Sequence, residues 1–132
     1  MPVTNLSKKT WLATTVRRAD NFFTRLVGLL RRRRLGPEEA LWLVPSQGIH
    51  TIGMKFAIDV IFLDKNNRVI GVIPGLSPYR ATGIRLAAHS VLELPNGILK
   101  KSQTEVGDLL EVSLATSSAM DDLKETSLNR VG

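Results

Sequence analysis

The residues best suited to chemistry lie between Ser46 and Asp64, in the segment SQGIHTIGMKFAIDVIFLD. Here His50 and Asp59 stand among alternating apolar residues, where a strand that only builds a core would not need them. A His beside a carboxylate can act as a general base, because the carboxylate fixes the tautomer of the imidazole. The segment therefore marks a candidate site, although it does not name a reaction.

Three further side chains accompany this pair. Glu93 lies in the apolar strand VLELP, while Thr51 can hydrogen-bond across the turn that follows His50. Met54 lies in that turn and is expected either to plug the core or to face a ligand. Because an unpaired buried charge is too costly, each ionisable group needs a partner, an exposed position or a shifted pKa. The candidate ligand-binding residues are His50, Thr51, Met54, Asp59 and Glu93.

The same side chains can also be explained by a purely structural role, and we favour this explanation over ligand binding for them. In it, Asp59 accepts backbone N–H groups of the turn at 53–57, with His50 or Lys55 as a neighbour. A shifted pKa marks active sites only in a statistical sense, so catalysis is the weaker alternative. The His-x-x-x-His spacing of a zinc site is absent, and no metal and no cofactor is predicted.

Nucleophilic and phosphate-binding motifs are missing. The chain has no Cys, which excludes thiolate chemistry and disulfides. Ser46 and Ser90 lie outside a Gly-x-Ser-x-Gly elbow, and no glycine-rich phosphate loop occurs. His89 is expected to be a partly exposed turn residue.

A run of four arginines dominates the charge of the chain. Residues 1–35 carry nine Lys or Arg and one acid, Asp20, within a formal net charge of +6. Such a patch can grip the phosphates of a nucleic acid, but no aromatic cluster nearby offers stacking to bases. The alternative is a helix end whose dipole favours cations. The weak nucleic-acid candidates are Arg31, Arg32, Arg33 and Arg34.

The composition is that of a soluble globular protein. The 132 residues are 43% hydrophobic and 23% charged, enough for one domain with its own core. The first residues lack the apolar stretch of a secretory signal, and no apolar run is long enough for a membrane span. We therefore expect a cytoplasmic protein.

Hydrophobic periodicity predicts mainly strands after one helix. Phe22, Leu26, Leu29 and Leu30 form a single helical stripe that Gly36 and Pro37 end. A long loop is expected at 74–88, a length that is often functional. The predicted strands are 9–16, 40–44, 47–52, 58–64, 68–73, 90–95 and 108–115.

These elements favour a mainly β (α+β) fold. We expect a compact β-barrel or β-sandwich with one amphipathic N-terminal helix packed against it. Residues 1–115 are predicted to form a single mostly-β domain. The polar residues after Thr116 indicate a disordered tail over 116–132.

Several ordered motifs, IHTIGMKFAIDVIFLD, NRVIGVIPGLSP, VLELPNG and VGD, resemble those of a widespread prokaryotic domain family of unknown function. The resemblance covers about residues 20–112 and implies one compact, mainly β domain without an established activity. Many relatives carry Cys where this chain has Ser46, so an activity that needs that thiol would not extend to this chain. The family's signature positions fall on Arg25, Gly28, Leu29, Leu30, His50, Thr51, Met54, Asp59, Glu93, Gly97, Gly107 and Asp108.

The function predicted from these features is a small binding or accessory module. Its cleft would lie near His50, Met54 and Asp59, edged by the 74–88 loop, and would take a small polar ligand or a protein segment. One alternative is a hydrolase-like enzyme that uses His50 with Asp59 or Glu93. The other is a nucleic-acid-associated protein that binds through the arginine run. Whether the protein is an enzyme stays open at this stage.

Overall fold

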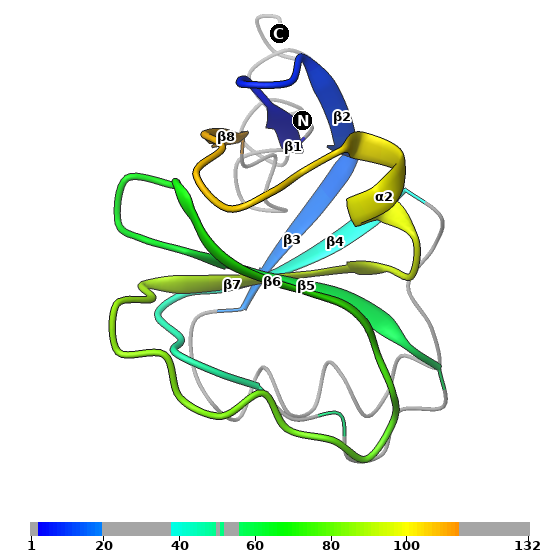
Figure 1. Ribbon diagram of the computed structural model, residues 1–132, viewed down its shortest axis with the longest axis vertical. Helices are drawn as coiled ribbons and strands as arrows, with labels where there is room; N and C mark the ends of the chain where they lie inside the picture. Colours follow the sequence, from blue (N-terminus) through cyan, green and yellow to red (C-terminus); the bar gives the residue numbers. More distant parts are fainter. Residues whose placement is uncertain (1–2, 20–37, 50, 52–55, 114–132) are drawn as a thin grey trace, which may run out of the picture.

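Strands dominate the computed structural model, which describes residues 3–19, 38–49, 51 and 56–113 (Figure 1). The mainly β prediction is therefore confirmed. The predicted helix at Phe22 to Leu30 lies outside the described residues. The elements are β1 (Val3–Asn5), β2 (Thr10–Ala13), β3 (Thr15–Ala19), β4 (Glu39–Leu43), β5 (Ile58–Leu63), β6 (Val69–Leu76), β7 (Ser90–Pro95), the short helix α2 (Ile98–Ser102) and β8 (Leu110–Val112).

The described strands form two open sheets, so the prediction of a closed barrel is wrong. The three-stranded sheet has the order β2-β1-β8, and the five-stranded sheet has the order β3-β4-β7-β5-β6. The strand pairings among the described residues are antiparallel, except that β3 is parallel to β4. The segment predicted as one strand at 9–16 divides at Thr14, whose backbone N–H bonds to the Glu38 carbonyl oxygen at 2.9 Å. Because β2 and β3 join different sheets, this segment connects the sheets at a bend.

Two hydrophobic clusters cover the two faces of the five-stranded sheet. One cluster lies between the sheets and combines side chains such as Val3, Leu92 and Leu110. The other lies on the opposite face and includes Phe62 and Val91. Since β5 and β7 are buried on both faces, their sequences are nearly continuous in apolar residues. In Figure 1 the small sheet and α2 lie above the five-stranded sheet, and the segments before β5 and after β6 lie below it.

The polar side chains next to β1 tie the first described strand to the last turn. The Asp108 carboxylate accepts hydrogen bonds from Asn5 Nδ2 at 2.8 Å and from Lys8 Nζ at 2.7 Å. Burial alone would raise the pKa of Asp108, but the hydrogen bonds from Asn5 and Lys8 outweigh it and lower that pKa. Arg25, another partner suggested by the sequence for Asp108, lies outside the described residues.

Candidate functional site

Asp59 is buried, and its carboxylate bonds only to backbone N–H groups among the described residues. Oδ1 accepts from Gly75 N at 2.8 Å, while Oδ2 accepts from Gly97 N at 3.0 Å and from Leu99 N at 2.8 Å. The carboxylate thus joins β5 to β6 and to the beginning of α2. This agrees with the structural explanation that Asp59 caps backbone donors. The donors, however, belong to these distant segments, whereas that explanation expected them in the turn before β5.

Glu93 lies on the other face of the same sheet. Asp59 is opposite Leu94 in the register of β5 with β7, while Glu93 is opposite Val60, so the two carboxyl groups point to opposite faces. Among the described residues neither carboxyl oxygen of Glu93 has a hydrogen-bond partner, and burial raises the pKa of this residue to about 8. The structure therefore does not bring Asp59 and Glu93 together.

Thr51 fastens the segment before β5 to the segment after β6. It is buried, its Oγ1 donates to the Ser77 carbonyl oxygen at 2.7 Å, and it accepts from Arg80 N at 2.8 Å. Its backbone N–H also bonds to the Arg80 carbonyl oxygen at 2.7 Å. The predicted hydrogen bonding of Thr51 thus extends across to residues 77–80. His50, Met54 and the arginine run lie outside the described residues.

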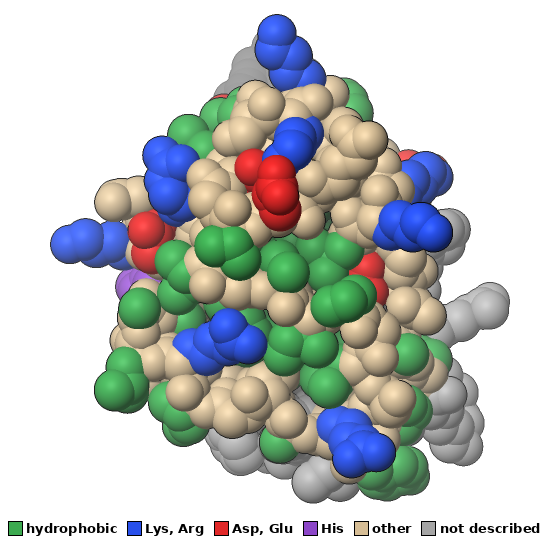
Figure 2. Space-filling view, viewed as in Figure 1, with side chains coloured by type: hydrophobic (Ala, Val, Ile, Leu, Met, Phe, Trp, Pro, Cys, Tyr) green, Lys and Arg blue, Asp and Glu red, His purple; other side chains and the backbone are tan. Residues whose placement is uncertain are grey.

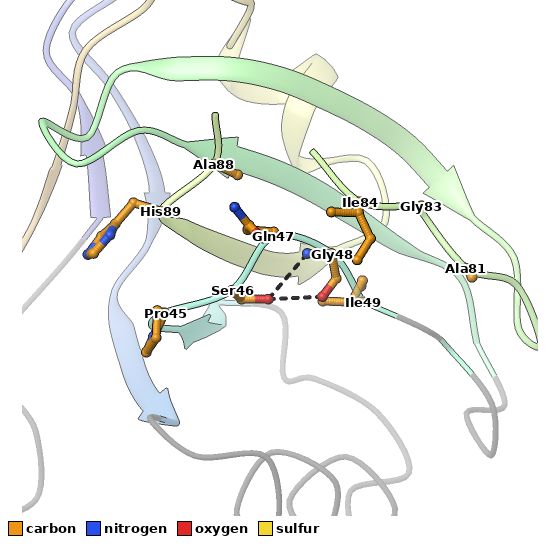
Figure 3. A pocket seen from close by; sticks show the side chains of 10 residues that line it. All are labelled: Pro45, Ser46, Gln47, Gly48, Ile49, Ala81, Gly83, Ile84, Ala88 and His89. Carbon is orange, nitrogen blue, oxygen red and sulfur yellow. Dashed lines mark hydrogen bonds between the residues drawn. The ribbon is translucent and has the colours of Figure 1, made fainter. Parts of the chain in front are cut away.

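A pocket of about 660 Å³ opens between two loop segments, one at 45–49 and one at 81–89 (Figure 3). We call the two segments the pocket walls. Thr82 N donates to the Ile49 carbonyl oxygen at 3.0 Å, and Arg85 N donates to the Gln47 carbonyl oxygen at 2.8 Å. A third bond, from Ser46 N to the His89 carbonyl oxygen, measures 2.9 Å. The lining residues are Pro45, Ser46, Gln47, Gly48, Ile49, Ala81, Gly83, Ile84, Ala88 and His89.

The pocket walls approach most closely at two glycines. A Cβ on Gly48 would collide with the carbonyl oxygen of Gly83, so only glycine fits there without moving the opposite backbone. Gly83 itself has a φ of 75°, in the left-handed region. The Gly48 backbone is held further by Ser46, whose Oγ donates to the Gly48 carbonyl oxygen at 2.9 Å.

Ser46 and His89 do not form a nucleophile–base pair. In Figure 3 the Ser46 side chain is joined by dashed lines to Gly48, and the His89 ring extends away from it. A Ser nucleophile needs a base within hydrogen-bond reach, and His89 does not supply one here. Within the described ranges, no group of three or more His, Cys, Asp or Glu is placed to hold a metal ion.

None of the described residues that line the pocket is acidic. Arg80 is exposed, and the Arg85 guanidinium lies 4.4 Å from the centroid of the Phe62 ring. In Figure 2 the lower part of the drawn face carries hydrophobic and basic side chains, and acidic side chains lie above it, in part beside the purple His. The described lining itself therefore contributes no negative charge.

The sequence did not predict this pocket, although its patterns singled out two segments that contribute to it. It flagged the 74–88 loop as long enough to be functional, and it placed a strand at 47–52. The structure has β6 up to Leu76, and pairs the loop that follows with residues 46–51 through backbone bonds. Gly48 and Gly83 were the available signal, because a glycine outside a turn often marks a close backbone approach.

Together, the two open sheets and the loop-lined pocket define a mainly β fold whose pocket is built on connecting segments. The chain belongs to the DUF192 family, described as "Uncharacterized ACR", whose model matches residues 3–112. The family resemblance suggested by the sequence motifs is thereby confirmed. No activity is established for the family by that description.

The relatives are also uncharacterised. A UPF0127 protein of Pyrococcus furiosus is 35% identical over 113 residues, covering 81% of this chain and 94% of the relative. A UPF0127 protein of Pyrococcus abyssi is 36% identical over 115 residues, covering 83% of this chain and 95% of the relative.

The fold is shared with a solved structure. The crystal structure of a protein of unknown function from Novosphingobium aromaticivorans superimposes with a TM-score of 0.70 at 23% identity. The match covers 85% of this chain and 84% of that one. At this identity the likeness extends to the fold alone. The part of this chain that the structure describes has no helix long and apolar enough to cross a membrane.

Proposed function

We propose that the protein is a binding module whose ligand occupies the pocket between the pocket walls, 45–49 and 81–89. The observation that carries the proposal is the pocket itself, since about 660 Å³ is within the usual range for ligand sites. Backbone hydrogen bonds hold its walls in place before any ligand arrives. A preformed site spends little free energy on ordering its loops when the ligand binds.

The segment for which the sequence predicted a cleft, near His50 and Asp59, directly follows the first pocket wall in the chain. The wall at 45–49 leads directly to His50 and Thr51, and Thr51 anchors the loop from which the second wall continues. In the proposal, Asp59 and Thr51 position the segments that frame the site, and the ligand contacts the pocket walls. The ligand is a small molecule or a segment of a protein.

The test is an NMR fragment screen on the folded protein. Fragments are expected to shift the backbone amide signals of Gly48, Gly83 and Ile84, and Ala81→Phe should abolish these shifts by filling the pocket. Ala87→Phe is the matched control, because Ala87 is equally exposed but does not line the pocket. Hits that shift other surfaces, or that persist in the Ala81→Phe protein, would rule the pocket out as the ligand site.

The two alternative functions gain no support from the described residues. The hydrolase-like alternative needs His50, which lies outside them, and its two candidate carboxylates lie on opposite faces of the sheet. The nucleic-acid alternative depends on the arginine run, which also lies outside. Ligand binding is therefore the function that we propose.

A further inference from the structure

We infer that the ligand of this pocket is an acidic peptide segment of another protein, with one apolar side chain in the pocket and carboxylates beside Arg80 and Arg85. The inference rests on the proposed function and adds the chemical class of the ligand. It follows from the charge of the pocket surroundings, the exposed apolar side chains at the rim and the placement of one guanidinium.

Charge complementarity selects an anionic partner. None of the described residues that line the pocket is acidic, and Arg85 lies in the 81–89 wall with Arg80 directly before it. Within the described part of the chain, neither Arg80 nor Arg85 forms an ion pair. A basic surface without internal compensation attracts carboxylates and repels basic partners.

Three large apolar side chains are exposed on the 79–86 stretch of the loop, which we call the rim; of these, Ile84 lines the pocket. Tyr79, Ile84 and Leu86 are 68%, 73% and 82% exposed, and all three lie within eight residues of one loop. Tyr and Arg are enriched in protein–protein interfaces. The surfaces of monomeric soluble proteins, in contrast, rarely expose large apolar patches. A partner that covers this rim would remove the apolar surface from water.

The pocket favours a peptide over a lipid bilayer as the occupant. A bilayer surface is flat and would cover the rim without filling the cavity of about 660 Å³ between the walls. A peptide can insert one apolar side chain into such a cavity and keep its neighbouring carboxylates outside, near the arginines. The lining suits this side chain, because it includes Ile49, Ile84 and Ala88.

Arg85 is already held in position for a carboxylate. Its guanidinium lies over the Phe62 ring, with 4.4 Å between its central carbon and the ring centroid. It also occupies the space above Gly71, where a Cβ would collide with Nη1. A guanidinium fixed in this way loses little side-chain entropy on binding, and it offers a planar pair of donors to a carboxylate.

The test uses three fluorescently labelled, end-capped hexapeptides that differ only in charge. Each has Leu-Phe at its centre, flanked on both sides by two Glu, two Gln or two Lys residues. Fluorescence anisotropy with the full chain is expected to show binding of the Glu peptide at least about tenfold tighter than the Lys peptide. Raising the salt concentration should weaken binding of the Glu peptide, because exposed charges are screened.

Variants locate the interaction. Arg80→Gln combined with Arg85→Gln should weaken the Glu peptide by about tenfold, whereas Arg17→Gln, on exposed β3, should leave it unchanged. Ala81→Phe should weaken binding of both the Glu and the Gln peptides, and Ala87→Phe should not. If the double variant unfolds at a lower temperature, Arg80→Gln alone carries the test, since that side chain is exposed.

The outcomes separate this inference from the proposed function. Equal binding of the Glu and Lys peptides, or binding only to vesicles of phosphatidylserine and phosphatidylcholine, would overturn the acidic-peptide inference. If Ala81→Phe still abolished the NMR shifts of fragments, the pocket would remain the ligand site. If the fragments also failed to shift the pocket walls, both ideas would be rejected.

Discussion

At the scale of single residues, two carboxyl groups of the central sheet have opposite environments. Asp59 accepts three backbone N–H groups, which compensate its burial. Within the part of the chain that the structure describes, Glu93 has no hydrogen-bond partner for either oxygen, and it is fully buried. Burial therefore raises the pKa of Glu93 to about 8. The two residues thus differ in what they contribute to stability.

Replacing Asp59 should destabilise the protein more than replacing a similar exposed carboxylate. Asp59→Ala leaves three donors without their acceptor, and we expect the free energy of unfolding to fall by roughly 3 kcal/mol. Asp64→Ala is the control, because Asp64 accepts from Asn66 N and Arg68 N in an exposed hairpin turn. It should cost about 1 kcal/mol, since water can replace the lost acceptor. Equal losses in urea unfolding would contradict the capping role of Asp59.

Glu93 should make the protein less stable as the pH rises. Its pKa is about 8 in the folded protein, against an ordinary value of 4.5 in the unfolded chain, so the unfolded chain ionises at lower pH. The stability is fully present below pH 4.5 and is lost progressively until the pH passes the folded pKa. Glu93→Gln removes this dependence and should raise the free energy of unfolding by roughly 2 kcal/mol at neutral pH, with little effect at acidic pH.

Urea unfolding of both proteins between acidic and slightly alkaline pH measures that difference. Glu111→Gln, on the exposed side of β8, is the control for loss of a carboxylate. A constant difference between Glu93→Gln and the parent across this range would show that Glu93 is not buried in its neutral form.

At the scale of elements, backbone pairing outside the strands builds the site. Residues 46–51 and 79–89 exchange several backbone hydrogen bonds, although neither segment is among the strands. Their close approach depends on Gly48, because any Cβ there meets the Gly83 carbonyl group. The stability of the pocket walls is therefore a property of backbone contact more than of side-chain packing.

Replacing each of two glycines with alanine should distinguish backbone contact from side-chain contact. Gly48→Ala pushes against backbone and should lower the free energy of unfolding by roughly 2 kcal/mol, while moving the amide signals of residues 81–84. Gly71→Ala pushes against a side-chain group, the Arg85 guanidinium, which can be displaced from the Phe62 ring without moving any backbone, so it should cost less than about 1 kcal/mol. Similar costs for both variants would indicate that the walls can shift freely.

Several elements were predicted well from the sequence, because the signals for them lie within the elements themselves. The strand predicted at 90–95 matches β7, and 58–64 matches β5 to within one residue, because apolar runs end at turn residues. The turn after β5 contains two Asn residues, which tolerate a positive φ, and Asn67 has a φ of 66°. β1 was missed, since its three residues are too few to show a period.

Contacts between distant segments could not be predicted in the same way. The donors to Asp59 lie 16, 38 and 40 residues further along the chain, and nothing near Asp59 identifies them. The opposite orientation of Glu93 depends on the register between β5 and β7, which alternation in one strand does not fix. The pocket likewise needs two segments to meet that are more than thirty residues apart.

At the scale of the whole molecule, the last described strand completes the small sheet. β1 lies between β2 and β8, and Val3 is the cross-strand partner of Val112. The family match also ends at residue 112. The segment from β1 to β8 therefore contains both sheets.

Truncation tests whether this segment is the folding unit. A chain that ends at Ser113 should unfold at the same urea concentration as the full chain. A chain that ends at Gly107 lacks β8 and Asp108, so it loses one edge of the small sheet and one of the two ion-pair partners of Lys8. It should be destabilised by several kcal/mol, or fail to fold. Destabilisation of the chain that ends at Ser113 would place the boundary later.

The pairing of β1 with β8 has a consequence for synthesis on the ribosome. β1 is made first, but one of its two neighbours is among the last described residues to be translated. β5 and β6 are joined by a short hairpin and can pair much earlier, because their loop closes at little entropic cost. In nascent chains, the β5–β6 hairpin should therefore be protected from proteolysis before β8 has left the exit tunnel and can pair with β1.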